Sequence, residues 1–259
     1  MFKYCSLFSG SSGNSFLITS DNTNILVDAG VSSKKIVTAL SDLEIDINKI
    51  DAILVTHEHI DHTKSLQTIT CKYNIPIYLN KKTYNALGVI ADKIPDKSIN
   101  FFNIAEPFKI KDFKIFPFPI PHDAADPCGF NIYYNNKKIT VATDIGHISD
   151  ELMEYLKNST SILLESNYDP EILKFSSYPY LLKKRISGET GHLSNQIAGK
   201  TLAALYKSGL KNAILVHLSK ENNFPELAYQ TVFDEIGNNT NLALSIAPRN
   251  EPSKIYEIV

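Results

Sequence analysis

Three histidines and an aspartate lie within the short stretch Thr56-His57-Glu58-His59-Ile60-Asp61-His62. An apolar, β-branched run precedes this stretch, and a segment with apolar residues at helical spacing follows it, so we expect a turn between a strand and a helix. Imidazole nitrogens and carboxylate oxygens are the ligands that zinc and similar divalent ions take. The spacing allows His57 and His59 to face one ion and Asp61 and His62 a second ion. The stretch therefore predicts a metal site rather than a solvated polar loop.

Five predicted strands stop at an ionisable residue, and in each case that residue is Asp, Glu or His. These strand-end residues are Asp28, His57, Asp144, Glu165 and His217. In layered α/β proteins, ligands gather at the carboxyl ends of strands, where the chain leaves the core. We therefore expect the five residues to contribute to a common site.

Counting ligands indicates how many ions the site takes. With His122, which follows a proline-rich stretch, the candidate donors number seven: His57, His59, Asp61, His62, His122, Asp144 and His217. A catalytic zinc keeps about three protein ligands and an open position, so seven donors suit two ions, with Asp144 able to bridge them. Three plainer interpretations stay open: His122 as a solvated loop residue, Asp144 as a turn residue, and His217 as a core histidine.

Composition sets the broad class. The chain has 259 residues, 43% of them apolar, and a formal net charge of −2, which argues against a basic nucleic-acid coat but allows a local basic patch. It has neither an apolar run long enough to span a membrane nor the features of a signal peptide at its start. The three cysteines, Cys5, Cys71 and Cys128, are typical of reduced core thiols in a cytosolic protein rather than of a disulfide framework. We expect a single domain over residues 1–259 and a cytoplasmic location.

The remaining elements are expected from periodicity and turn signals. Strands are predicted at 3–8, 16–19 and 24–27, short antiparallel strands within 98–118, and a hairpin around Asn135-Asn136. Ser149 and Ser194 are expected to cap helices, and Pro225 to open one. Residues 168–191 show no clear period, so no element is predicted there.

These residues resemble the metallo-β-lactamase superfamily, whose signature matches His57-x-His59-x-Asp61-His62. Asp28, His122, Asp144 and His217 match its other motifs in order and approximate spacing. The resemblance implies an α/β fold, a four-layer αββα sandwich of two mixed sheets flanked by helices. It also implies the ligand sets. One ion takes His57, His59 and His122, the other takes Asp61, His62 and His217, Asp144 bridges, and Asp28 orients a ligand from behind.

Two further elements narrow the chemistry within the superfamily. Glu165-Ser166-Asn167-Tyr168 and Gly191-His192-Leu193-Ser194 resemble elements of the phosphodiesterase branch, where the histidine assists the leaving group and the glutamate orients it. His192 can also be read as a helix-start residue. Position 59 carries Glu in the iron-binding flavoprotein branch, so the histidine here disfavours a redox role.

The stretch Phe8–Ser15, together with Pro121-His122-Asp123 and Gly129-Phe130, resembles the bacterial WalJ (YycJ) group. That group is associated with 5′-to-3′ exonuclease action on double-stranded DNA, and its members are often encoded beside a cell-wall two-component system. The resemblance implies a nucleic acid substrate, DNA in particular, no membrane, and a possible link to two-component signalling. No large insertion separates Asp144 from His217, so RNA specificity is not implied.

Candidate substrate-binding residues complete the prediction: Ser12, Asn14, Asn167, Lys183, Lys184 and Arg185. A Gly/Ser turn can present N–H and hydroxyl groups to a phosphate, although such turns also serve as plain connections. Basic side chains can hold backbone phosphates without reading sequence, although charge runs are often solvated faces.

The expected function is a dinuclear metal-dependent phosphodiester hydrolase that acts as a 5′-3′ exonuclease on double-stranded DNA. A hydroxide that bridges the two ions is the expected nucleophile, with Asp61 to orient or deprotonate it and His192, steadied by Glu165, to assist the leaving oxygen. The all-nitrogen and oxygen ligand set accepts Zn or Mn, and also Fe. Two alternatives remain: a thioester or lactam hydrolase resembling glyoxalase II, or a metal-containing accessory protein of a cell-wall two-component system.

Overall fold

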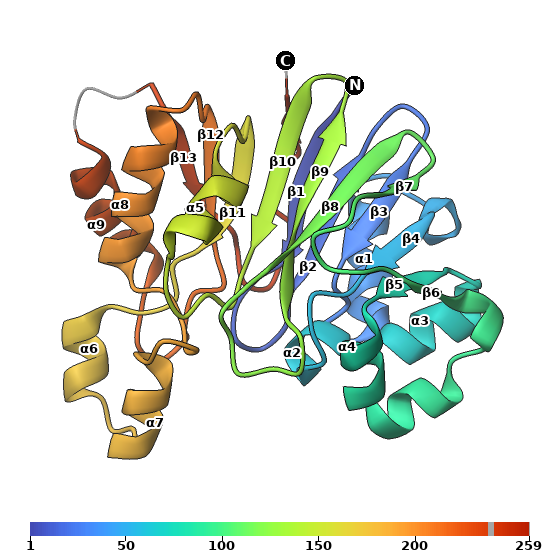
Figure 1. Cartoon of the computed structure of the whole chain (residues 1–259), viewed down its shortest axis with the longest axis horizontal. Coiled ribbons are helices and arrows are strands. Elements are labelled where there is room, and N and C mark those ends of the chain that lie inside the picture. Colours follow the sequence, from blue (N-terminus) through green and yellow to red (C-terminus); the bar gives the residue numbers. More distant parts are fainter. Residues whose placement is uncertain (238–240, 259) are drawn as a thin grey trace. The chain divides into compact units, whose positions relative to one another are not determined.

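The computed structural model describes residues 1–237 and 241–258 and contains two compact units (Figure 1). The first unit comprises Met1–Pro117, Ala124–Cys128 and the residues from Pro248 onward. The second comprises Phe118–Asp123 and Gly129–Ala247. Each unit is made of segments that are discontinuous in sequence. The organisation of residues 1–259 as a single domain stays a prediction.

A mixed seven-stranded sheet forms the centre of the first unit. Its strands lie in the order β14 (Tyr256–Glu257), β1 (Lys3–Phe8), β2 (Ser15–Thr19), β3 (Asn24–Val27), β4 (Ala52–Leu54), β5 (Ile77–Leu79) and β6 (Ile99–Phe101). Strands β14, β1, β2 and β3 pair antiparallel, whereas β3 to β6 pair parallel. Because β3 and β4 run in the same direction, their carboxyl ends meet at one edge of the sheet.

The helices of the first unit are α1 (Ser33–Asp42), α2 (Ile60–Thr63), α3 (Leu66–Tyr73) and α4 (Lys81–Ala86), with short 3-10 turns η1 (Ile47–Lys49), η2 (Gly88–Lys93) and η3 (Asp96–Ser98). Of these helices, α1 and α3 bury an apolar face. Ile36 and Leu40 of α1 and Ile69 of α3 join Leu26 and Ile53 of the sheet in one core. Ile36 and Leu40 are four residues apart, and Ile69 is three residues from Leu66, so each pair lies on one face of its helix. The core therefore anchors the turn that carries the histidine cluster.

The second sheet is also mixed and seven-stranded. Its strands lie in the order β13 (Ala243–Ile246), β12 (Asn212–Val216), β11 (Ser161–Glu165), β10 (Lys137–Ala142), β9 (Cys128–Tyr134), β8 (Phe113–Pro119) and β7 (Phe108–Ile110). Strands β10 to β13 pair parallel, β9 and β10 form the predicted hairpin, and β7 pairs antiparallel with β8. The parallel strands again bring their carboxyl ends to one edge.

The helices of the second unit are α5 (Asp150–Leu156), α6 (Pro170–Phe175), α7 (Tyr180–Ile186), α8 (Asn195–Tyr206) and α9 (Pro225–Ile236). The predicted caps are confirmed, because Ser149 accepts a hydrogen bond from Leu152 N and Ser194 accepts one from Ile197 N. Helix α9 starts at Pro225 as expected and packs against α8 and β13.

Two expectations about the elements need correction. Residues 168–191, for which no element was predicted, contain α6 and α7, which are too short to show a period, and no residue of α7 is buried. In the stretch 98–118, β7 and β8 are antiparallel as expected, but β6 pairs parallel with β5. All three cysteines are free thiols, and Cys5 and Cys128 are buried as expected. The expectation of a core thiol is wrong for Cys71, which is exposed because α3 buries its other face through Leu66, Ile69 and Thr70. Over the described residues, no helix combines the length and apolar character that crossing a bilayer requires.

Candidate metal centre

The predicted strand-end residues lie where the sequence places them within each unit. In the first unit Asp28 directly follows β3, and His57 lies three residues beyond β4. In the second unit Asp144 follows β10, Glu165 ends β11, and His217 directly follows β12. Each unit therefore collects part of the candidate donor set at the carboxyl edge of its parallel strands.

Three of these residues adopt a left-handed backbone. The φ angles are 65° at Asp28, 59° at Asp144 and 57° at His217. For residues other than glycine this region is sparsely populated and costs of order 1–3 kcal/mol. Strain of this kind concentrates at functional sites, where the surrounding structure holds it in place.

Asp28 orients the histidine cluster of the first unit. The carboxylate is fully buried, and its Oδ1 accepts a hydrogen bond from Thr56 N at 2.9 Å. Its Oδ2 accepts from Thr56 Oγ1 at 2.9 Å and from His62 Nδ1 at 2.7 Å. Asp28 thus fixes the orientation of the His62 ring, and its role behind a metal ligand stays a prediction.

These contacts set the tautomers of two histidines. His62 donates through Nδ1 to a carboxylate, so the lone pair of the neutral ring lies on Nε2. The Thr56 hydroxyl gives its hydrogen to Asp28, so it accepts from His57 Nδ1 at 3.0 Å, and the lone pair of His57 is again on Nε2. Thr56 was not among the predicted site residues, although its position just before His57 was visible in the sequence.

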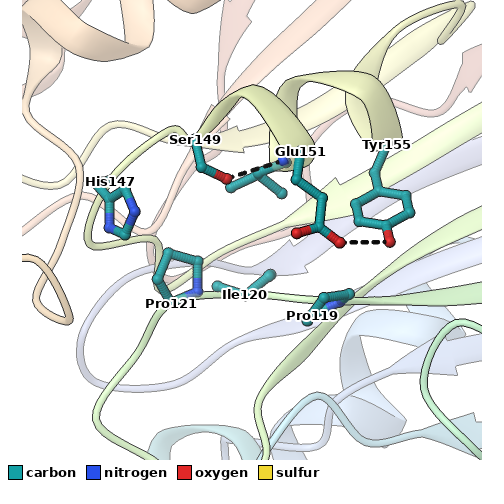
Figure 2. A pocket seen from close by; sticks show the side chains of 8 residues that line it. Pro119, Ile120, Pro121, His147, Ser149, Glu151 and Tyr155 are labelled. Carbon is teal, nitrogen blue, oxygen red and sulfur yellow. Dashed lines mark hydrogen bonds between the residues drawn. The ribbon is translucent and has the colours of Figure 1, made fainter.

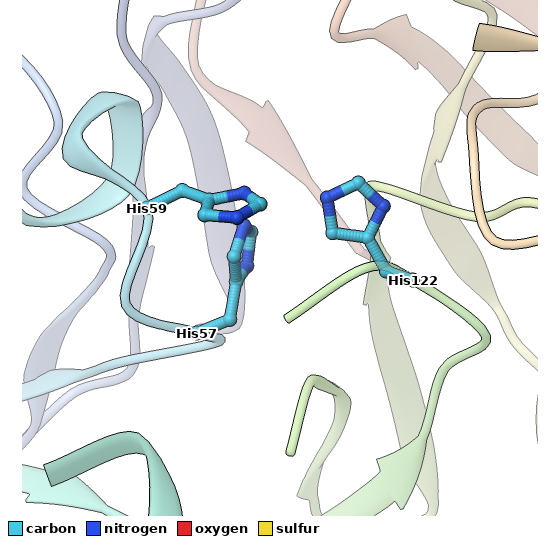
Figure 3. Close-up of side chains that lie close together, drawn as sticks. All are labelled: His57, His59 and His122. Carbon is cyan, nitrogen blue, oxygen red and sulfur yellow. The ribbon is translucent and has the colours of Figure 1, made fainter. Parts of the chain in front are cut away.

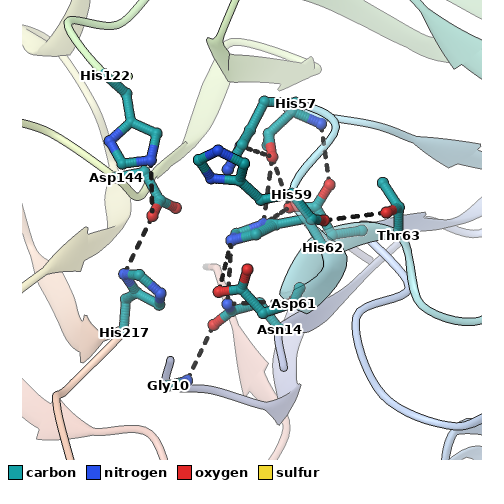
Figure 4. Close-up of polar contacts among 12 residues, drawn as sticks. Gly10, Asn14, His57, His59, Asp61, His62, Thr63, His122, Asp144 and His217 are labelled. Atoms are coloured by element: carbon teal, nitrogen blue, oxygen red, sulfur yellow. Dashed lines mark hydrogen bonds and ion pairs between the residues drawn. The ribbon is translucent and has the colours of Figure 1, made fainter. Parts of the chain in front are cut away.

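The rest of the cluster gathers around these two rings. The rings of His57 and His59 lie edge to face with centroids 4.6 Å apart, and those of His57 and His62 are 4.2 Å apart (Figures 3 and 4). A carboxylate oxygen of Asp61 lies 3.5 Å from His62 Nε2. The first unit thus groups three imidazoles and one carboxylate, a set of donors that suits a divalent ion.

Asn14 and Gly30 hold the turn that bears Asp61. Asn14 N donates to the Asp61 carbonyl at 2.8 Å, and the Asn14 side chain lies 3.2 Å from His62 Nε2 (Figure 4). A Cβ at Gly30 would lie 1.6 Å from the Asp61 carbonyl oxygen, so this position admits only glycine without moving the turn. Asn14 was predicted to bind substrate, and the contacts named here are with the turn that carries Asp61 and His62. Gly30 was not predicted.

Glu165 has the corresponding role in the second unit. Its Oε1 lies 2.7 Å from His217 Nδ1 and 2.9 Å from His192 Nδ1. Its Oε2 accepts from Ile145 N at 2.8 Å and Leu193 N at 2.9 Å. One buried carboxylate therefore orients both a predicted metal ligand and the predicted leaving-group histidine, and turns Nε2 of each ring away from itself.

Burial alone would raise the pKa of Glu165, but the charges and hydrogen bonds of His192 and His217 lower that pKa to about 2. For His192, burial opposes the charged ring, whereas the charge and hydrogen bond of Glu165 favour it, and the net effect raises the pKa of His192. Glu165 is thus an acceptor at neutral pH, and His192 holds its proton more firmly than an isolated imidazole does.

His122 and Asp144 complete the donors of the second unit (Figure 4). His122 Nδ1 donates to the Gly191 carbonyl at 3.1 Å, which leaves the lone pair on Nε2, and that atom lies 3.7 Å from Asp144 Oδ1. Desolvation lowers the pKa of His122, so this ring is neutral at physiological pH. Ligand atoms of Asp144, Glu165, His192 and His217 all lie within 4.8 Å of one another.

A pocket of about 290 Å³ lies beside this donor group, between α5 and the chain that leads to His122 (Figure 2). It is lined by Pro119, Ile120, Pro121, His147, Ser149, Glu151, Leu152 and Tyr155. The side chains of Glu151 and Tyr155 hydrogen-bond to each other at 3.0 Å, and His147 Nδ1 donates to the Glu189 carbonyl. This pocket was not predicted, because its lining comes from two separate segments, residues 119–121 and 147–155.

The other predicted substrate-binding residues have varied environments. Ser12 is exposed on its turn, whereas Asn167 is buried and donates to the His217 carbonyl at 2.8 Å. Lys183 donates to two carbonyls at the end of α6, and Arg185 forms an ion pair with Asp123. Lys184 is exposed. Substrate binding by these residues stays a prediction.

Comparison with known proteins places this geometry in a family. The sequence matches the beta-lactamase superfamily domain over residues 23–218. The chain belongs to the metallo-β-lactamase superfamily. It is 37% identical over 226 residues to the exodeoxyribonuclease YycJ of Bacillus anthracis, covering 87% of this chain and 86% of the relative. It is 36% identical over 237 residues to the exodeoxyribonuclease WalJ of Streptococcus pneumoniae, covering 91% and 88%.

A solved structure shows the same fold. The metallo-β-lactamase fold protein YhfI of Bacillus subtilis superposes with a TM-score of 0.71 at 16% identity, covering 97% of this chain and 98% of the other. The predicted α/β fold with two mixed sheets flanked by helices is therefore confirmed. The predicted likeness to the WalJ group is confirmed as well.

The donor atoms themselves fit divalent metal ions. His57, His62, His122 and His217 each turn Nδ1 to a hydrogen-bonding partner and keep Nε2 as the donor, which is the usual arrangement of metal-binding histidines. Together with the family, this makes the chain a metal-dependent hydrolase. The number and identity of the ions stay predictions.

Proposed function

We propose that the chain is a dinuclear metal-dependent phosphodiesterase that degrades double-stranded DNA from the 5′ end. The donors of the two units, seven in all, would share two ions: His57, His59 and His122 at one, Asp61, His62 and His217 at the other, and Asp144 between them. Ions held there would supply Lewis-acid activation of water and offset charge on the phosphate. The ligand count and the histidine tautomers support this assignment.

The observation that carries the phosphodiesterase assignment is the contact of 2.9 Å between Glu165 Oε1 and His192 Nδ1. A departing alkoxide needs a proton or a positive charge. Glu165 fixes the ring so that Nε2 of His192 can give its proton to the leaving oxygen, and the raised pKa of His192 keeps that proton available. His192 is therefore the group that acts on the leaving oxygen, and Glu165 positions it.

DNA is the proposed polymer because the two relatives at 36–37% identity bear the name exodeoxyribonuclease. In the first unit Asp61 lies beside His62, where its carboxylate can orient the attacking water. The cytoplasmic location and the link to a cell-wall two-component system belong to the same proposal.

The test is a substrate panel with and without chelator: a duplex labelled at either 5′ or 3′ end, RNA, bis(p-nitrophenyl) phosphate, S-lactoylglutathione and a chromogenic lactam. We expect chelator-sensitive cleavage of the duplex with release of 5′-terminal nucleotides. Asp61→Ala and His192→Ala should each lower turnover of duplex by about 100-fold or more, the range of general acid–base contributions. His147→Ala, which alters the remaining histidine of the chain, is the matched control and should keep its turnover.

Two results would contradict the proposal. Unchanged turnover of duplex and bis(p-nitrophenyl) phosphate in both Asp61→Ala and His192→Ala would show that the proposed mechanism is wrong. If the protein cleaves the thioester or the lactam, and His192→Ala cleaves it at the wild-type rate, the alternative of a thioester or lactam hydrolase would be favoured instead.

A further inference from the structure

A second pocket, of about 460 Å³, lies on the two short helices that the sequence did not reveal. It is lined by Lys174, Tyr178, Tyr180, Lys183, Lys184 and Ser187, all of which belong to α6, α7 and their flanks. The lining contains three cations and no carboxylate. Such a pocket suits an anionic occupant.

The lysines differ in how they are held. Lys183 Nζ donates to the carbonyls of Lys174 and Ser176, both at 2.7 Å, so it is a fixed charge with one donor remaining. Lys174 lies 3.5 Å from Glu171, and because both side chains are exposed this ion pair is weak. Lys184 is exposed on α7, next to Lys183 in the sequence. The pocket thus keeps a net positive charge.

The same helices expose an unusual amount of apolar surface. The side chains of Phe175, Tyr180 and Leu181 are 75–77% exposed, and no residue of α7 is buried. A helix that buries nothing gains little from the core, and exposed aromatic rings beside lysines are typical of surfaces on which unpaired bases stack.

The backbone connects this pocket to the proposed chemistry within the same unit. His192 N donates to the Ile186 carbonyl at the end of α7, at 2.8 Å. A Cβ at Gly191 would lie 2.2 Å from the carbonyl oxygens of Arg185 and Ile186, so the segment that carries His192 packs directly on α7. A DNA strand whose terminal phosphate lies at His192 would therefore extend from His192 along α7.

We propose that the α6–α7 pocket binds an unpaired segment of the DNA strand, with bases stacked on Tyr178 and Tyr180 and phosphates held by Lys183 and Lys184. This inference rests on the proposed function and adds a strand-holding surface to it. It would let the enzyme hold one strand after the duplex end has opened.

The test measures binding of fluorescein-labelled phosphorothioate oligonucleotides, which resist cleavage, to the purified metal-loaded protein at several salt concentrations. We expect Tyr180→Ala to weaken binding of single-stranded dT12 by about fivefold or more, since it removes one stacking platform. Lys184→Ala should reduce the slope of log K against log salt by about 0.7, the value for one phosphate contact on a single strand. Tyr229→Ala and Lys200→Ala on other helices are the matched controls.

Tyr180→Ala should bind a blunt duplex with wild-type affinity and hydrolyse bis(p-nitrophenyl) phosphate at the wild-type rate, because neither ligand offers an unpaired base to stack on Tyr180. Wild-type affinity of Tyr180→Ala for dT12, an equal loss of its affinity for the blunt duplex, slower hydrolysis of the small substrate by this variant, or a wild-type salt slope in Lys184→Ala would each overturn the inference. Absence of any phosphodiester hydrolysis by the wild-type protein would refute the proposed function, and the binding data would still decide the pocket.

Discussion

At the scale of single residues, one carboxylate in each unit controls the tautomers of the neighbouring histidines. Asp28 holds His62 in the first unit, and Glu165 holds His192 and His217 in the second. A carboxylate at neutral pH only accepts hydrogen bonds, so each imidazole that faces it must present N–H there and keep its lone pair on the far nitrogen. Both carboxylates are fully buried, which makes these contacts strong and their loss costly.

Glu165→Gln tests this control. The amide would set an NH₂ group against one of the N–H donors that Glu165 now accepts, so the rings would lose their fixed orientation. We expect metal content or turnover of bis(p-nitrophenyl) phosphate to fall by about 10–100-fold, as for other residues behind metal ligands. Elemental analysis and steady-state rates measure this, with the exposed Glu189→Gln as control. Unchanged metal content and rate in Glu165→Gln would show that the carboxylate does not orient the site.

At the scale of elements, Lys138 joins the second sheet to the end of α5. The ammonium group, on a residue that is 6% exposed, donates to the Tyr155 carbonyl at 2.8 Å and to the Lys157 carbonyl. A cation at the carboxyl end of a helix also interacts well with the helix dipole. Helix α5 lies in the segment between Asp144 and Glu165, so anchoring the helix also helps to hold these two candidate site residues in place.

Lys138→Met should lower the free energy of unfolding at pH 7 by about 1–3 kcal/mol, because it removes the side-chain donor of the Lys157 carbonyl and leaves the Tyr155 carbonyl with Asn131 as its remaining side-chain donor. Denaturant unfolding at equilibrium measures the change. Lys211→Met, at an exposed position of the same unit, is the control and should stay near wild type. Equal stability of the two variants would mean that Lys138 does not anchor α5.

The same lysine makes the free energy of unfolding depend on pH. Burial lowers the pKa of Lys138 from its usual value of 10.5 to about 8. Between these two values the unfolded chain binds more protons than the folded one, so this group makes stability rise with pH across that window. The rise should be present in the wild-type protein and in Lys211→Met and absent in Lys138→Met. Parallel curves for Lys138→Met and wild type between pH 8 and 10.5 would contradict it.

How much the sequence predicted depends on the range of the interaction. The strand ends at Asp28, Glu165 and His217 were predictable, because an apolar run followed by an ionisable residue is a local signal. The shared contact of Glu165 with His217 was not, since the two residues are 52 positions apart and only the parallel pairing of β11 and β12 joins them. Helices α6 and α7 were missed because each has at most seven residues and little burial to impose a period.

At the scale of the whole molecule, the proposed ligands are divided between two compact units. If the units share the ions, metal binding must stabilise both of them together, because an ion that binds only the native state adds its binding free energy to folding. The division of the ligands therefore makes metal removal a test of the proposed assembly.

We expect chelation to lower the melting temperature by roughly 5–10 °C, from about 2.7 kcal/mol of linkage at a hundredfold excess of metal over Kd and about 2–4 °C per kcal/mol for a chain of this size. His57→Ala in the first unit and His217→Ala in the second should each remove most of this shift, as differential scanning calorimetry would show. His147→Ala should keep it. A full shift in His217→Ala would mean that the first unit binds its metal alone.

The left-handed backbone at Asp28, Asp144 and His217 has a consequence for attempts to improve this enzyme. Glycine at any of these positions would relieve a conformation that the native side chain tolerates poorly, and it would also delete a side chain that we propose to hold or orient the metal ions. A library selected for heat resistance alone would therefore accumulate glycine at these three positions first, and the selected proteins would be stable but inactive. Selection rounds that alternate heating with a catalytic screen would retain the native residues.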